Sequence, residues 1–268
     1  MLAWTPFDQL RKMSDYDCVT IYLFRQMIGG TSVSSYPEEI PFDLDDIRAA
    51  IARCKADGLL KSNVKNPADV KYTYDARRNL PDEVEQLWPV TWLPVAKGYY
   101  KFRRTKRKNI IDLSSLASGV KLETAIDQTP PFVSKLLGMD EQATFTRVRN
   151  AGLINVVLGF QAWPIQGHHR TTVSYGQIEV DEVQAGLDGE QATIVPISGK
   201  GGADKLSWSQ VLNLNTYGVE KAPRPGMLVR SMGLWRDPSG AVWIVEFTPD
   251  LDIDNIEISK VRRFKFLS

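Results

Sequence analysis

Two β-like runs and the turn between them decide the fold expected for this chain. The first run opens as Gly176-Gln-Ile-Glu-Val-Asp-Glu-Val183, and the second closes as Val195-Pro-Ile-Ser-Gly-Lys-Gly-Gly202. The stretch Gly186-Leu-Asp-Gly-Glu190 joins them, and an Asp-Gly pair between such runs is a strong signal for a two-residue hairpin turn. The sequence therefore predicts a β-hairpin with strands over 176–185 and 192–199.

Helical and β-like patterns flank this hairpin. A helix pattern covers 140–159 before it, and another covers 207–215 after it. Two further β-like runs, 227–235 and 241–247, are joined by Asp237-Pro-Ser-Gly240, which predicts a second hairpin. The order helix, hairpin, helix, strands indicates a mixed α/β fold.

The first third of the chain reads as mainly helical. Helices are expected over 17–27, 43–54 and 67–78, where apolar spacing, Gly stops and a first-turn Pro mark them. The helix at 43–54 could belong to a winged-helix-like reader, although no residue in it singles out bases.

A β-like segment and a linker follow these helices. Residues 88–113 carry the β-like runs, and the polar, Pro-rich stretch 114–131 reads as the linker. We therefore expect an N-terminal helical/β domain over 1–128, for DNA recognition or subunit contact, and a second domain over 129–268.

Three acids crowd the first strand of the central hairpin: Glu179, Asp181 and Glu182. Carboxylates so close repel one another unless a metal ion or a lysine neutralises them. A turn at Asp188-Gly189 pairs Glu179 with Ser198, and it puts both on one face with Asp181 and Lys200. One more residue in the turn puts Glu182 on that face in place of the other two acids.

An acid beside a lysine on adjacent strands suits phosphodiester hydrolysis that depends on a divalent metal. Carboxylates hold Mg²⁺, whose charge activates a water and stabilises the scissile phosphate. The lysine of the pair, Lys200, would position that water and offset the negative charge of the phosphate.

The stretch from His168-His-Arg-Thr-Thr-Val173 through the acidic strand to Pro196-Ile-Ser-Gly-Lys-Gly-Gly202 and Gln210 resembles the PD-(D/E)xK nuclease superfamily. It is most similar to a family of restriction-type endonucleases of prokaryotes. The resemblance implies a restriction-endonuclease-like core, metal binding by Asp181 or Glu182, a catalytic Lys200 and a supporting Gln210. It also implies Mg²⁺, with Mn²⁺ as a substitute, and a homodimer with one centre for each DNA strand.

The sequence departs from that family's pattern at one position. Ser198 stands where the motif has Asp or Glu. Glu179 opposite it could supply the missing carboxylate, a water on the Ser198 hydroxyl could complete the metal's shell, or the nuclease could be weak or inactive. The predicted metal ligands are therefore Glu179, Asp181, Glu182 and the slot at Ser198.

A basic cluster is the best electrostatic footprint for nucleic acid. It alternates with aromatic residues and consists of Lys101, Arg103, Arg104, Lys106, Arg107 and Lys108. Arg170 is a further candidate for a phosphate or base contact. An ordinary solvated loop is the competing interpretation of such a run.

Composition excludes several classes of protein. The 268 residues include two Cys and two His, and the formal net charge is +1. A disulfide framework, a Cys-rich zinc site and a three-His zinc centre are therefore excluded. No apolar stretch is long enough to span a membrane and the start lacks a signal-peptide pattern, so a cytoplasmic location without membrane contact is expected.

The function expected from these observations is that of a Mg²⁺-dependent, sequence-specific endonuclease of the type II restriction kind, acting on double-stranded DNA. Two alternatives remain open. One is a non-catalytic DNA-binding protein on a decayed nuclease scaffold, which Ser198 favours. The other is a nuclease for single strands or RNA that uses the same site.

Overall fold

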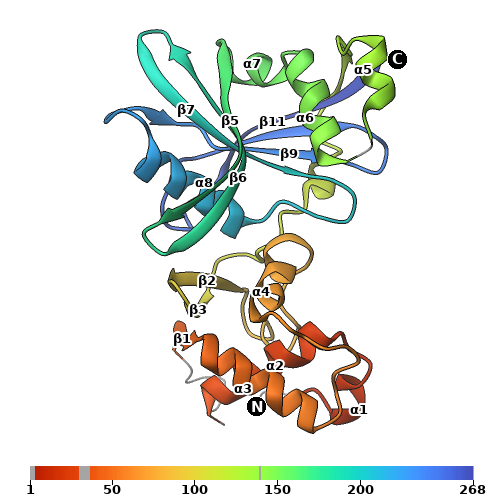
Figure 1. Cartoon of the computed structure of the whole chain (residues 1–268), viewed down its shortest axis with the longest axis vertical. Helices are drawn as coiled ribbons and strands as arrows, with labels where there is room; N and C mark the ends of the chain where they lie inside the picture. Colours follow the sequence, from red (N-terminus) through yellow and green to blue (C-terminus); the bar gives the residue numbers. More distant parts are fainter. Residues whose placement is uncertain (1–3, 30–36, 139, 268) are drawn as a thin grey trace. The chain divides into compact units, whose positions relative to one another are not determined.

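The structure, a computed structural model, describes residues 4–29, 37–138 and 140–267. The chain divides into two compact units. The first comprises the chain up to Ile110 together with Ser174–Gly176, and the second comprises the rest from Ile111 onward. Both contain helices and strands, so the mixed α/β class predicted from the sequence is confirmed (Figure 1).

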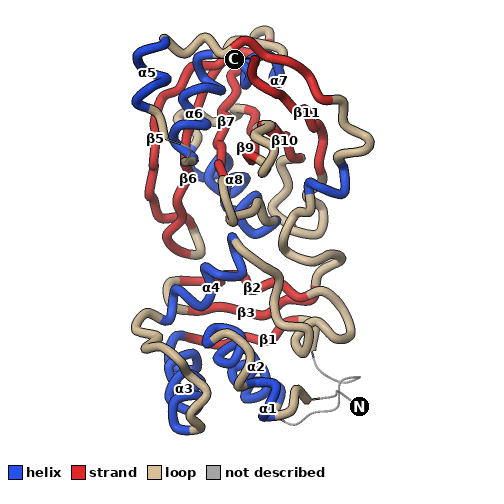
Figure 2. The backbone as a smooth tube through the Cα atoms, turned by 90° about the vertical axis from the view of Figure 1, so that its right-hand side faces the viewer, coloured by secondary structure: helices blue, strands red, loops and turns tan. Residues whose placement is uncertain are grey.

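The first unit combines helices with a small antiparallel sheet, whose strand order is β1-β3-β2. Figure 2 shows the three strands running across the unit with α2 and α3 beside them. Its elements are α1 (Phe7–Leu10), α2 (Asp15–Ile28), β1 (Glu39–Asp43), α3 (Leu44–Ala56), α4 (Pro67–Ala76), β2 (Val90–Ala96) and β3 (Tyr99–Arg104).

Local sequence signals explain where the helices of this unit begin. Asp43 caps α3 through a capping box with Asp46, and Asn66 caps α4 just before Pro67. The three predicted helices are confirmed, and β1 is an additional strand that the sequence pattern did not indicate. Phe42, Trp92 and Phe102 of the sheet form an aromatic core in edge or tilted contact, and Phe24 of α2 packs edge-on against Phe102.

The second unit is built on an eight-stranded mixed sheet. The strand order is β4-β11-β10-β9-β7-β6-β5, and β8 pairs with β7. Its strands are β4 (Leu122–Ile126), β5 (Ala162–Val173), β6 (Gly176–Asp188), β7 (Gln191–Lys200), β8 (Leu228–Val229), β9 (Met232–Arg236), β10 (Val242–Phe247) and β11 (Ile258–Leu267). Its helices are η2 (Leu113–Leu116), α5 (Pro131–Leu136), α6 (Glu141–Asn150), α7 (Leu153–Leu158) and α8 (Trp208–Lys221).

Helices cover this sheet in the way that the alternation of its side chains requires. Val195 and Ile197 share a buried cluster with Phe145 of α6 and Val157 of α7. Ser198 and Lys200 occupy the alternate positions of β7, so their side chains belong to the opposite face. The crossover helix α8 connects β7 to β9, which run parallel.

The second unit begins earlier than the predicted boundary at 128 and 129. The stretch 114–131, interpreted as a linker, contains β4, which pairs in parallel with β11. Ile111 also belongs to this unit, where its N–H donates to the carbonyl of Leu206. The pairing partner of β4 lies near the far end of the chain, so no local pattern revealed this strand.

Other elements follow the sequence with local corrections. The helix predicted over 140–159 is two helices, because Gly152 adopts a left-handed conformation with φ 64° between α6 and α7. The predicted hairpin across Asp237 to Gly240 is confirmed as β9 and β10. Among the described residues, no helix has the length and apolarity that crossing a bilayer requires.

Candidate metal centre at the open end of the β6–β7 hairpin

The central hairpin closes one residue later than predicted. Asp188 pairs with Gln191, so Gly189 and Glu190 form the turn, with Gly189 at its first central position and φ 62°. The whole register therefore moves by two residues, and the expected pairing of Glu179 with Ser198 is wrong. A shift of two leaves each side chain on its predicted face, because side chains alternate with a period of two.

Asp181 lies where the two strands separate. The last paired residues are Glu182 and Ile197, and beyond them the Asp181 carboxylate bridges to β7. Its Oδ2 accepts hydrogen bonds from Ser198 Oγ at 3.0 Å and from the Gly199 N–H at 2.8 Å. Lys200 Nζ lies 3.8 Å from the same oxygen, so Asp181, Ser198 and Lys200 meet as the sequence predicted.

Burial makes these polar groups unusual. Ser198 is 5% exposed and Lys200 is 8% exposed, although lysine is almost never buried without a partner. The ammonium is neutralised by the Asp181 carboxylate beside it. A buried lysine and acid at the open end of a hairpin indicate a site for an anionic substrate or for a cation.

Glu141, at the start of α6, is a second carboxylate of this cluster. Burial raises its pKa, Lys200 lowers it, and Asp181 raises it again through its charge and a shared hydrogen bond, so that the pKa of Glu141 is about 7. The sequence analysis missed this residue. Its position after Asp140 reads only as an acid in the first turn of a helix, where carboxylates are common.

Gly199 allows α6 to approach β7 at this point. A Cβ on Gly199 would lie 2.3 Å from the Phe145 ring and 2.9 Å from Glu141 Oε1. At Gly201 the nearest atom to such a Cβ is 3.9 Å away. Because Gly199 has no side chain, α6 can lie close to β7. This close approach is what brings Glu141 to the site.

We expect Gly199→Ala to lower the free energy of unfolding by about 1–3 kcal/mol, because the added methyl overpacks the contact with Phe145. Gly201→Ala is the matched control and should change it by less than about 0.5 kcal/mol. Urea denaturation of both variants measures the difference. Equal stability of the two would contradict the close approach of α6.

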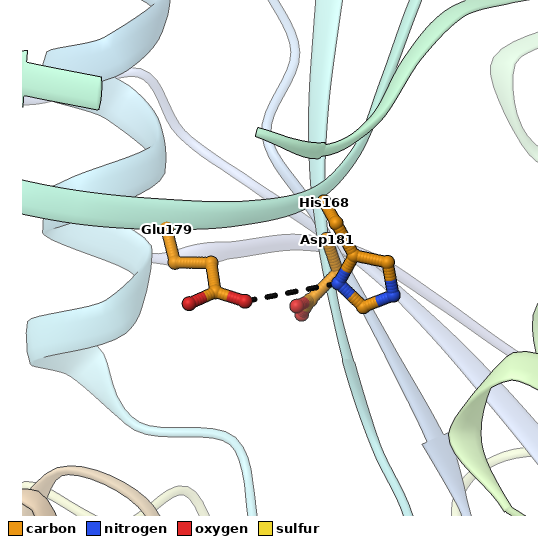
Figure 3. Close-up of side chains that lie close together, drawn as sticks. All are labelled: His168, Glu179 and Asp181. Carbon is orange, nitrogen blue, oxygen red and sulfur yellow. Dashed lines mark ion pairs between the residues drawn. The ribbon is translucent and has the colours of Figure 1, made fainter. Parts of the chain in front are cut away.

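His168 and Glu179 form a further group of side chains with Asp181. The ligand atoms of His168, Glu179 and Asp181 all lie within 4.8 Å of one another (Figure 3). His168 Nδ1 is 3.7 Å from Glu179 Oε1, the pair that Figure 3 joins with a dashed line. His168 has φ 45°, and among the described residues it alone is a non-glycine with positive φ.

Hydrogen bonds from neighbouring residues orient the carboxylates of Glu179 and Asp181, and in each case they hold one of the two oxygens. Arg170 donates to Glu179 Oε2 from Nη2 at 2.7 Å and from Nε at 3.1 Å, which leaves Oε1 toward the imidazole. These hydrogen bonds, opposed by partial burial, lower the pKa of Glu179. Asp181 is oriented in the same way, because Oδ2 alone bonds to β7. Carboxylates that bind metals are commonly oriented by such second partners.

The second histidine does not join the group. The His169 ring contacts Tyr217 edge-on, with centroids 5.6 Å apart, and also contacts Gln166. Of the two adjacent imidazoles, only that of His168 reaches the carboxylates. Its left-handed backbone, which the sequence did not signal, interrupts the strand's regular alternation.

Glu182 was the alternative to Asp181 as the metal-binding acid, and its partners lie elsewhere. Its Oε2 is 2.9 Å from Arg149 Nη2, and its Oε1 accepts a hydrogen bond from Gln184 at 2.5 Å. Alternation puts it on the face of α6, opposite to Asp181. The possibility that one extra turn residue brings Glu182 to Lys200 is therefore wrong.

Gln210 lies in the first turn of α8, where its N–H donates to the capping Ser207. Its side-chain Oε1 is buried, and no described residue donates to it. Within the described part of the chain no bond joins Gln210 to Asp181 or Lys200, so the supporting role stays a prediction.

The basic cluster belongs to the first unit, on β3 and the turn after it, and much of its charge is paired. Lys101 and Arg103 approach Glu39 at 2.6 and 3.9 Å, and Lys108 approaches Glu85 at 3.3 Å. Arg104 lies 4.1 Å over the Trp88 ring. Lys106 and Arg107 also have interactions within the protein. Three of the six cations therefore lie beside carboxylates, and the role of this cluster as a nucleic-acid footprint stays a prediction.

In comparisons of this chain with protein-family models, curated proteins and solved structures, no match is found.

Lowering the pH should stabilise the metal-free protein relative to Glu141→Gln. The folded-state pKa of Glu141, about 7, lies above the ordinary value of 4.5, so the folded protein binds the proton more tightly than the unfolded chain. Stability from this group is full below about pH 4.5 and is lost as the pH rises toward about 7. Urea denaturation with a chelator present, across that range, should show a steeper decline in wild type than in Glu141→Gln. Parallel curves would contradict a buried, protonated Glu141.

Proposed function

We propose that this chain is a divalent-metal-dependent endonuclease that hydrolyses phosphodiester bonds of double-stranded DNA, of the type II restriction kind. The observation that carries the proposal is the convergence of Asp181, Glu141 and the buried Lys200 where β6 and β7 separate. The helix, hairpin, helix and strand that the PD-(D/E)xK resemblance implies correspond to α6, the β6–β7 hairpin, α8 and β9, with α7 and β5 as additional elements between α6 and the hairpin.

The donor set fits a divalent ion. Two carboxylates, Asp181 and Glu141, share a buried position with one ammonium, and the raised pKa of Glu141 means that a proton occupies the place of a missing positive charge. A divalent cation would replace that proton. Asp181 would hold the ion, either with Glu141 or with Glu179 and His168, whose ligand atoms lie within 4.8 Å of one another and of Asp181. The ion would supply Lewis-acid activation of a water and stabilisation of the phosphate.

The protein's own groups have separable roles in such a centre. Lys200 would hold the attacking water or a phosphate oxygen, and its ammonium would offset the charge that develops on the phosphate. Ser198 Oγ and the Gly199 N–H fix the Asp181 carboxylate, which leaves Oδ1 for the ion. Ser198 therefore serves as an orienting donor, and Glu141 takes over the carboxylate that the family motif has at position 198.

His168 makes a transition metal the better occupant. Transition-metal ions, Mn²⁺ among them, accept an imidazole ligand more readily than Mg²⁺, which strongly prefers oxygen ligands. We expect His168→Ala to weaken Mn²⁺ binding by about tenfold or more and to change Mg²⁺ binding less. His169→Ala, which removes the imidazole beside Tyr217, is the matched control and should leave both affinities unchanged. Calorimetric titration measures them, and equal losses for the two variants would argue against ligation by His168.

The first unit supports recognition of duplex DNA by the order of its elements. A helix (α2), a strand (β1), two helices (α3 and α4) and a closing hairpin (β2 and β3) form the arrangement of a winged-helix reader. In helix-turn-helix proteins the second helix of the pair enters the major groove, which assigns that role to α4. Its Tyr72 is 47% exposed and carries the Arg77 guanidinium 5.6 Å over its ring.

The proposal is tested by incubating the protein with mixed plasmid and phage DNA in Mg²⁺ or Mn²⁺. Discrete fragments are the expected result. Natively folded protein that leaves duplex DNA intact would overturn the proposal. If single-stranded DNA or RNA competes better than duplex, the nuclease activity belongs to that substrate instead. The homodimer that goes with duplex cleavage is measured by sedimentation of the free protein.

A further inference from the structure

The outer edge of β4 is a surface of the second unit that the candidate metal centre does not use. β4 is the first strand of the eight-stranded sheet, and among the described strands it pairs only with β11. The outer side of an edge strand presents backbone N–H and C=O groups that can pair with another strand. Three of the five residues of β4, Leu122, Thr124 and Ile126, are exposed. This edge is therefore open to pairing with a further strand.

The two edge strands of the sheet differ in how they resist such pairing. β5, at the other edge, carries Pro164, which has no N–H to donate, and the left-handed His168, which interrupts the extended backbone. Proline and irregular backbone are devices by which proteins protect exposed edges. β4 has neither, and its one charged residue, Glu123, accepts hydrogen bonds from Arg262 of β11 at both oxygens. The edge of β4 is therefore the unprotected one.

Large apolar side chains gather on one face beside this edge. Leu122 is 45% exposed and Ile126 is 70% exposed, and the alternation of a strand puts both on the same face. Leu267 of β11 pairs with Ile126 and is 53% exposed, so it extends that face. Ala125 faces the other way, into the core that contains Phe145. Exposed apolar residues that gather in one place mark interaction sites.

The sequence of β4 is complementary to itself when two copies run antiparallel about a two-fold axis at Thr124. Leu122 then lies opposite Ile126 of the second copy, and the two Thr124 residues face each other. Apolar pairs and Thr–Thr pairs are both favourable across antiparallel strands. A displacement of two residues keeps each face but puts Glu123 opposite either Glu123 or Asp127 of the second copy. Directly opposed like charges are destabilising, so charge selects the register centred on Thr124.

We propose that the edge of β4 binds a second copy of this chain by antiparallel pairing of β4 with β4. The contact is isologous, because a two-fold axis presents the same surface on both copies, and it joins the two sheets into one. It would supply the contact surface of the homodimer that goes with duplex cleavage. The proposal does not rest on the endonuclease assignment, because an unprotected edge pairs whether or not the protein cuts DNA.

The test is sedimentation velocity of the full chain over a range of protein concentrations, with a chelator present. We expect wild type to dimerise with a dissociation constant of about 10 µM, because pairing of two short strands gives a contact at the small end of the size range. Leu122→Lys and Ile126→Glu each put a charge opposite an apolar side chain twice in the symmetric dimer. Each variant alone should therefore associate about tenfold or more weakly than wild type.

An equimolar mixture of Leu122→Lys and Ile126→Glu should regain dimers. The introduced ammonium of one copy then lies opposite the introduced carboxylate of the other, and the remaining pair is again Ile126 with Leu122. A purely structural effect of either substitution would not be reversed by mixing. Both side chains are exposed, so the substitutions are compatible with the folded monomer, and urea denaturation checks this.

Ile165→Glu is the matched control, because it introduces the same charge at an exposed isoleucine of the other edge strand, β5, and should dimerise as wild type does. The proposal is overturned if wild type stays monomeric well above 10 µM, if both β4 variants dimerise like wild type, or if the mixture associates no better than its components. Cleavage by a protein that stays monomeric would overturn this proposal alone. A dimer that leaves DNA intact would overturn only the endonuclease.

Discussion

Lys200→Met should reduce the rate of DNA cleavage by about 10²–10⁴-fold, the usual worth of a positioned acid–base or electrostatic group. Methionine keeps the apolar stem of the buried lysine and removes only the ammonium that lies 3.8 Å from Asp181. Cleavage of supercoiled plasmid at saturating Mn²⁺ measures the effect. The loss should appear in kcat more than in KM, because the ammonium acts on charge that develops during the reaction.

A second readout separates catalysis from folding in this variant. Removal of the ammonium leaves the Asp181 carboxylate without its cation, so metal-free Lys200→Met should lose about 3 kcal/mol of unfolding free energy. Mn²⁺ should recover much of this loss by taking the place of the positive charge. Lys221→Met, at the exposed end of α8, is the control and should match wild type in both measurements. Full cleavage activity in Lys200→Met would remove lysine from the mechanism.

Asp181→Asn should abolish Mn²⁺ binding while the fold stays native. The asparagine oxygen can still accept the bonds from Ser198 and Gly199, so the local structure is kept and only the negative charge is lost. Asp181 is the carboxylate that both Glu141 and the His168–Glu179 pair approach, so its loss leaves these ligands without a common charged partner. Calorimetric titration with Mn²⁺ should show at least about a hundredfold loss of affinity, equivalent to about 3 kcal/mol.

Glu182→Gln is the matched control for this prediction. It changes the neighbouring acid, which pairs with Arg149 on the other face of the sheet, so it should lower stability and leave Mn²⁺ affinity unchanged. The reverse outcome, with binding lost in Glu182→Gln and kept in Asp181→Asn, would exchange the roles of the two acids. It would also contradict the register of β6 and β7.

The part of the site that the sequence predicted depends on alternation. Counting along two strands puts Asp181, Ser198 and Lys200 on one face, and an error of one residue in the turn, which moves the register by two, left that face unchanged. The same error misassigned the partner of Ser198, because the strongest turn signal, Asp188-Gly189, did not distinguish a turn at 188–189 from one at 189–190. The sequence therefore predicts the face of the sheet on which a side chain lies more securely than it predicts the residue paired with it on the neighbouring strand.

The parts that the sequence did not reveal depend on contacts between distant segments. Glu141 reaches Asp181 only because α6 lies against Gly199, and a glycine within a strand does not say which helix approaches it. His168 reaches Glu179 through a left-handed backbone that no residue pattern signals. The acids that pair with the basic cluster, Glu39 and Glu85, also come from segments outside it.

The most direct test of the account compares plasmid cleavage by wild type, Asp181→Asn and Glu182→Gln at equal concentration with Mn²⁺. The account predicts discrete fragments from wild type, the same fragments from Glu182→Gln, and intact plasmid with Asp181→Asn. Fragments from Asp181→Asn at the wild-type rate would contradict a metal centre at Asp181. Intact plasmid with wild-type protein that binds Mn²⁺ would contradict the endonuclease itself.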